Sequence, residues 1–147
     1  MFMSIGLFFV GLCMFVVFNS YKQKSTHDKE MAMQTAVSFV HLLSNGDSIS
    51  AFKYVWSGEQ LHIRSYETAQ AFKDSKILEV IKIDYDSAKN RPEYYQQFHK
   101  IILLMIKIKQ VHEDNAGNPP GNYILFITVV QKTPESNWLV AELGSGP

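Results

Sequence analysis

The clearest indication of the fold is the sequence HKIILLMIKIKQV at residues 99–111. Every even-numbered residue from 102 to 108 is apolar, whereas the odd-numbered series changes from apolar residues to lysine at Lys107 and Lys109. Alternation with a period of two is typical of a β-strand with one buried face. The pattern predicts a long strand that keeps one face in the core, while its other face emerges into water halfway along.

Turn formers and further alternating segments surround this strand. The sequence EDNAGNPPG, residues 113–121, predicts a hairpin loop, and residues 122–132 predict the returning strand. A second turn at 133–137 precedes a last predicted strand at 138–143. Upstream, residues 77–85 alternate with the same period and predict one more strand. Consecutive strands joined by turns indicate an antiparallel sheet of about four strands.

The segment before these strands has helical spacing. Apolar residues recur at threes and fours from Glu30, and Asn45-Gly46 favours a helix end there. Asp47 is a suitable N-cap for a second, short helix that continues to Val55. Residues 66–72 predict a third helical turn. Two to three helices followed by strands predict an α+β domain. The apolar face of the first helix comprises Met33, Ala36, Val37, Val40 and Leu43.

The N-terminal run MFMSIGLFFVGLCMFVVF, residues 1–18, contains no charged side chain. As a helix it would extend about 27 Å, close to the roughly 30 Å of a bilayer's hydrocarbon core. We therefore expect an uncleaved transmembrane anchor over residues 1–21, with residues 2–18 in lipid, a polar tether over 22–29 and one folded domain over 30–147. A cleaved signal peptide and a buried hairpin helix are the alternatives.

The orientation of this anchor follows from charge. Lys22, Lys24 and Lys29 follow the apolar run and no basic residue precedes it, which by the positive-inside rule places the domain in the cytoplasm. Basic residues upstream of Met1 would reverse this comparison. Cys13 allows a lipoprotein reading, but Leu12 stands where such signals have a small residue, so an unreactive thiol is the simpler interpretation.

Composition excludes several classes of function. With 14 basic and 14 acidic side chains, the chain has no net charge to attract nucleic acid. Residues 21–147 contain no cysteine, which excludes disulfide scaffolds and cysteine-ligated zinc sites there. The histidines are scattered and none form an i, i+4 pair. We expect no metal site and no cofactor.

The order of elements suggests a resemblance. An anchor, a long helix, a short helix after Asn-Gly-Asp and a meander ending in WLVAELGSGP, residues 138–147, resemble small membrane- or lipid-anchored proteins of Gram-positive bacteria with a domain similar to nuclear transport factor 2. The resemblance covers residues 30–147. It implies a cone of helices wrapped by a curved sheet, an uncharacterised activity and a location outside the cytoplasmic membrane, opposite to the charge rule.

Domains of this kind can enclose a pocket, and enzymes built on them use an Asp, His or Tyr inside it. The candidates here are Asp84, His99, Tyr54 and Tyr85. A catalytic base needs burial and reach to a substrate proton. Because Asp84 shares the polar parity of its strand with Lys82, a solvated strand edge is the simpler interpretation of this acid.

Aromatic and charged clusters suggest binding surfaces. Tyr94, Tyr95 and Phe98 could line a pocket or a partner surface, although such a cluster more often closes a core. Glu113 and Asp114 suit a solvated hairpin tip better than a calcium loop. The lysines that could form a basic strip facing anionic lipid or wall polymer, with Glu79 and Glu142 to neutralise it, are Lys100, Lys107, Lys109 and Lys132.

These observations predict a membrane-tethered, extracytoplasmic binding module that is not an enzyme, with an envelope protein or peptide as its partner. The alternatives are a small pocket enzyme of the hydratase or isomerase type and a component of an envelope secretion or conjugation assembly.

Overall fold

A computed structural model describes residues 26–57, 70–84, 93–114 and 117–145, without the side chains of 82–84 and 145. The chain divides into two units, residues 1–30 and 31–147, and the second contains the sheet. Within the described residues, no helix combines the length and hydrophobicity needed to cross a membrane. The anchor predicted over residues 1–21 lies outside these residues and stays a prediction.

Residues 26–44 are helical, so the first helix includes residues 26–29 of the stretch assigned to the tether. Its end is where the sequence predicts it. Gly46 has a φ of 76°, which glycine adopts without strain, and its N–H donates to the Leu43 carbonyl at 3.0 Å. The Asn45 N–H donates to the His41 carbonyl at 3.0 Å. The predicted Asn-Gly helix stop is confirmed.

The second helix, α2 (Ser48–Phe52), begins at the predicted N-cap. The Asp47 carboxylate accepts a hydrogen bond from the Ser50 N–H at 3.0 Å. The helix ends before Val55, contrary to prediction, because Val55 forms a parallel β-bridge with Val140 instead. Of the predicted third helical turn, residues 70–72 are helical and 66–69 lie outside the described residues.

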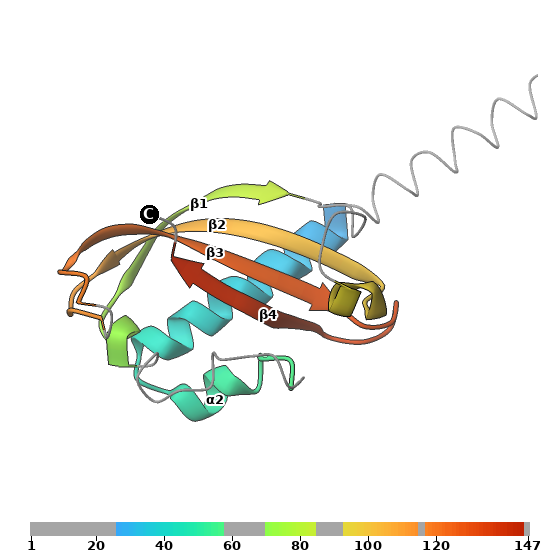
Figure 1. Ribbon diagram of the computed structural model, residues 1–147, viewed down its shortest axis with the longest axis horizontal. Helices are drawn as coiled ribbons and strands as arrows, with labels where there is room; N and C mark the ends of the chain where they lie inside the picture. Colours follow the sequence, from blue (N-terminus) through green and yellow to red (C-terminus); the bar gives the residue numbers. More distant parts are fainter. Residues whose placement is uncertain (1–25, 58–69, 85–92, 115–116, 146–147) are drawn as a thin grey trace, which may run out of the picture. The chain divides into compact units, whose positions relative to one another are not determined.

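Four strands form one antiparallel sheet in the order β1-β2-β3-β4 (Figure 1). A short 3₁₀ helix, η3 (Glu93–Gln97), precedes the second strand. The α+β class and the four-stranded antiparallel sheet predicted from the sequence are confirmed. The strands are β1 (Lys76–Asp84), β2 (Lys100–Gln110), β3 (Gly121–Gln131) and β4 (Trp138–Ser145).

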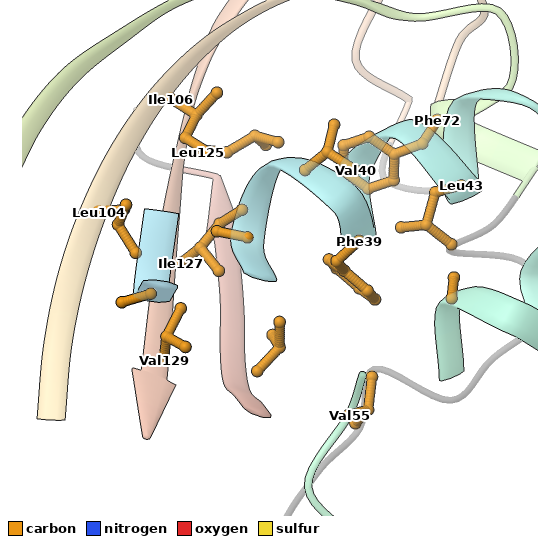
Figure 2. Close-up of a cluster of buried hydrophobic side chains, with 14 of the residues drawn as sticks. Phe39, Val40, Leu43, Val55, Phe72, Leu104, Ile106, Leu125, Ile127 and Val129 are labelled. Atoms are coloured by element: carbon orange, nitrogen blue, oxygen red, sulfur yellow. The ribbon is translucent and has the colours of Figure 1, made fainter. Parts of the chain in front are cut away.

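The core lies between the first helix and one face of the sheet. The even-numbered residues of β2 from Ile102 to Ile108 are fully buried, as predicted. They belong to one cluster with Phe39, Val40 and Leu43 of the helix, and Figure 2 shows these residues together with labelled side chains of β2 and β3. We call this side of the sheet the helix face and the opposite side the outer face.

The simple alternation predicted for β1 is wrong. Bulges lie between Ile77 and Glu79 and between Val80 and Lys82, so the period of two is interrupted twice. Ile77 and Val80 consequently pack against the core, whereas Leu78, at the first bulge, is 49% exposed. The bulges and exposed Lys76 also make β1 a poor template for pairing with another chain at the sheet edge.

A bulge in β4 decides where its acidic residue lies. Val140 is opposite Val129 and Glu142 is opposite Thr128, so Ala141 is the extra residue. In a regular strand, Glu142 would share the helix face with Val140, which is fully buried in the core. The bulge turns Glu142 to the outer face, beside Thr128.

Candidate functional site

The outer face is covered at one end by η3. A second hydrophobic cluster forms there from two aromatic residues, Tyr95 and Phe98, and the sheet residues Ile101, Val130 and Ala141. Ile101 and Val130 are directly opposite each other on β2 and β3, and they alternate with the residues of the helix face. This small cluster holds η3 on the sheet.

Trp56 brings a further segment to the same place. Its ring packs edge-to-face against Phe98, with ring centroids 5.0 Å apart. Its backbone N–H donates to the Val140 carbonyl at 2.9 Å, and the Val140 N–H donates to the Tyr54 carbonyl at 2.7 Å. The edge of β4 therefore positions Trp56, which stays half-buried beside η3.

Glu142 places a carboxylate in this region. The Tyr94 hydroxyl donates to Glu142 Oε1, and the Thr128 hydroxyl donates to Oε2 at 3.2 Å. Thr128 is buried, whereas Tyr94 and Glu142 are half-buried. The two hydroxyl groups come from η3 and β3, so they fix a β4 carboxylate at the boundary between the small cluster and solvent.

Tyr95 is close to the same carboxylate and is almost fully buried, with 1% of its surface exposed. Its burial raises the pKa of its hydroxyl far above the usual value, and the negative charge of the nearby Glu142 raises the pKa further. The phenol therefore keeps its proton at every physiological pH. Tyr95 can donate a hydrogen bond but cannot act as a base.

We call Trp56, Tyr94, Tyr95, Thr128 and Glu142 the Glu142 patch. Each carboxylate oxygen accepts a hydrogen bond from a hydroxyl group, which uses part of its acceptor capacity. Among the described residues, no lysine, arginine or histidine forms an ion pair with Glu142. The patch thus presents a fixed negative charge next to half-buried aromatic rings, an arrangement suited to binding a cationic group.

Of the predicted binding residues, the structure brings all three together. Tyr95 and Phe98 are buried in the small cluster, consistent with closure of a core. Tyr94 is half-buried, and its ring centroid lies 4.3 Å from that of Tyr95. Tyr94 is therefore the least buried of the three.

Of the four predicted catalytic candidates, the structure describes the side chains of His99 and Tyr54. His99 is exposed, and its backbone N–H donates to the backbone carbonyl of Gln131 at 2.8 Å. Tyr54 is half-buried against the main core. Asp84 is opposite Leu103 at the end of β1, an edge strand, and its side chain is outside the described residues, as is all of Tyr85.

The four lysines of the predicted strip do not form one strip. Lys100 begins β2 opposite Gln131, the last residue of β3 before Lys132, whereas Lys107 and Lys109 lie near the other end of β2. Lys107 is opposite Glu79, as the sequence suggested. Glu142 pairs in register with Thr128 and belongs to the η3 end, away from Lys107.

The hairpin between β2 and β3 is organised by Asp114. Its carboxylate accepts hydrogen bonds from the backbone N–H of Asn118 at 2.9 Å and from the Asn118 amide at 2.8 Å. Gly117 has a φ of 81°, and its N–H donates to the Asp114 carbonyl. These bonds shape the tip of the hairpin.

Sequence reasoning missed the central residue of the patch. From the sequence, Glu142 is only a possible counter-charge to lysines, and neither Thr128 nor Trp56 stands out. The available signal is that Trp138, Val140 and Glu142 share one parity in a strand that buries the first two. A carboxylate in a core series predicts a bulge, because a buried unpaired charge is costly.

Comparison with known proteins yields no relative: no protein family, no curated protein and no solved structure matches this chain.

Proposed function

We propose that this protein is a membrane-tethered binding module that is not an enzyme and that contacts an envelope protein or peptide through the Glu142 patch. The observation that carries the proposal is the half-buried carboxylate that Tyr94 and Thr128 hold in place beside aromatic rings. Such a group is preorganised for recognition, because the ordering of its side chain is already complete before a partner arrives.

The chemistry of the patch favours binding over catalysis. Proton transfer requires a group that gains and loses a proton near neutral pH. The raised pKa of Tyr95 keeps this phenol protonated, and the carboxylate oxygens of Glu142 already accept hydrogen bonds from Tyr94 and Thr128. A hydratase or isomerase would need a base with a free approach to its substrate.

The tether is proposed from the sequence. Residues 1–18 are apolar on every side of a helix and long enough to cross a hydrocarbon core. We place the domain outside the cytoplasmic membrane and propose that its arrangement, a long helix on a bulged antiparallel sheet, is similar to nuclear transport factor 2. The bulges in β1 and β4 supply the bending that such a curved sheet requires.

Photo-crosslinking in intact cells tests the binding surface. A benzophenone amino acid at Gln96, which is exposed on η3, samples the patch without removing any of its members. The control position is Ile49 on α2, which is 77% exposed and whose helix packs Ala51 into the main core on the helix face. We expect a discrete adduct from position 96 and none from 49. Absence of any adduct, or equal adducts from both positions, would refute the proposed surface.

Membrane fractionation and protease accessibility test the tether separately. We expect the full chain to stay with membranes in alkaline carbonate and the domain to be digested by protease added to intact protoplasts. Recovery in the soluble fraction would refute the anchor. Protection from the protease, with digestion restored by detergent, would refute the extracytoplasmic orientation.

A further inference from the structure

The charge of Glu142, which has no cationic partner among the described residues, specifies the kind of group that a partner protein must supply. Glu142 has two hydroxyl donors within reach and, among the described residues, no cationic one. A carboxylate that is half-removed from water without a counter-charge loses hydration that hydroxyl groups only partly replace. A cation arriving at this point restores the balance of charge.

We infer that the Glu142 patch is a recognition site for a lysine or arginine side chain of the partner protein, with Glu142 binding the cationic head and the Trp56 and Tyr94 rings contacting the aliphatic stem. This inference rests on the proposed function and names the chemistry of its partner. The edge-to-face contact with Phe98 and the two backbone bonds at Val140 hold Trp56 beside the β4 segment that carries Glu142.

Three features make the site selective for such a group. The negative charge excludes anions, and the half-buried rings favour a cation with apolar methylenes over a bare metal ion. Thr128 and Tyr94 orient the two carboxylate oxygens from opposite elements, β3 and η3. A guanidinium or ammonium group can then donate to lone pairs that the hydroxyl groups leave open.

The inference gives a functional reason for the bulge at Ala141. A regular β4 with an apolar residue at position 142 would extend the core and would place no carboxylate on the outer face. The chain instead has an extra residue, which brings a carboxylate to the outer face next to a buried threonine and two tyrosines. Bulges often re-aim one side chain at a binding site.

A peptide titration tests the inference on the full chain in zwitterionic detergent micelles. The probes are acetyl-Lys₄-amide and acetyl-Glu₄-amide, and the signal is the indole N–H resonance of Trp56. Trp138 is buried within the main core and serves as an internal reference. We expect the lysine peptide to shift the Trp56 signal saturably, with weakening at high salt, and the glutamate peptide to have no effect.

Variants assign the effect to Glu142. Glu142→Gln removes the charge and should weaken binding on the order of tenfold or more. The matched control is Glu79→Gln, which removes the same charge from β1 opposite Lys107 and should leave affinity unchanged. Unfolding curves check that both variants fold. If Glu142→Gln does not fold, the salt dependence of lysine-peptide binding to the wild type tests the inference independently.

The outcomes separate this inference from the proposed function. Loss of both the Gln96 adduct and peptide binding in Glu142→Gln, with Glu79→Gln unaffected, supports the cationic contact. A photo-adduct from position 96 that persists in Glu142→Gln, together with no binding of the lysine peptide to the wild type, overturns the inference and leaves the proposed binding surface intact. Equal affinity of the lysine peptide for both variants overturns the inference as well.

Discussion

The hydrogen bond from Tyr94 to Glu142 should be a measurable stabilising link between η3 and β4. Tyr94→Phe removes only the hydroxyl group and keeps the ring that packs on the small cluster. A hydrogen bond to a charged group contributes roughly 1.5–3 kcal/mol when it is well protected. Because both side chains are half-buried, solvent screening reduces this value, and we expect a loss of about 1–2 kcal/mol.

A double-mutant cycle isolates the coupling. Tyr94→Phe, Glu142→Gln and the double variant are compared by urea unfolding of the full chain in nonionic detergent, followed by near-ultraviolet circular dichroism. We expect a coupling free energy of about 1 kcal/mol, because glutamine keeps an acceptor oxygen for the Tyr94 hydroxyl but lacks the charge that strengthens the bond. A domain of this size loses roughly 3–6 °C in Tm for each kcal/mol.

Tyr123 is the matched control for this cycle. Its hydroxyl donates to the backbone carbonyl of Pro119 at 2.5 Å in an exposed position, with no charged partner. Tyr123→Phe should therefore cost less than Tyr94→Phe and combine additively with Glu142→Gln. Additive losses for Tyr94→Phe and Glu142→Gln would refute the hydroxyl clamp on which the patch depends.

Three further predictions concern the fold around the patch. Gly46→Ala should destabilise the domain by about 1 kcal/mol because its φ is positive, whereas Gly144→Ala, which has open space around it, should be nearly neutral in thermal unfolding. Ile127→Ala should cost about 2–5 kcal/mol in urea unfolding, and Ile124→Ala, on the exposed side of the same strand, roughly 0.5 kcal/mol; equal costs would contradict the assignment of the two faces. The raised pKa of Tyr95 stabilises the folded state fully below the unfolded pKa near 10, and this contribution decreases as pH rises above it; the difference in unfolding free energy between wild type and Tyr95→Phe should therefore shrink between pH 9 and 11, and a constant difference would contradict it.

Much of the fold was predictable because local patterns agree with the tertiary structure. The buried series of β2, the Asn45-Gly46 helix stop and the Asp47 N-cap each depend on neighbouring residues only. Period, cap and turn chemistry specify such features without knowledge of distant contacts. The same reasoning predicted that Tyr94, Tyr95 and Phe98 act together.

The parts that sequence reasoning missed depend on pairing between distant strands. The bulges in β1 and β4 arise from register with β2 and β3, and no local pattern measures register. The local pattern predicts that the helix continues to Val55. That prediction fails because Val55 pairs with Val140, which is 85 positions further along the chain. The Glu142 patch could not be predicted from the sequence for the same reason, since its members come from four separate segments of the chain.

If Glu142 provides the charge on which partner binding depends, loss of that charge must reduce contact with the partner in cells. The most direct measurement is the yield of the Gln96 photo-adduct in intact cells, compared between wild type, Glu142→Gln and Glu79→Gln at matched protein abundance. We expect the adduct yield to be reduced on the order of tenfold in Glu142→Gln and unchanged in Glu79→Gln. The same adduct yield in all three proteins would contradict this expectation.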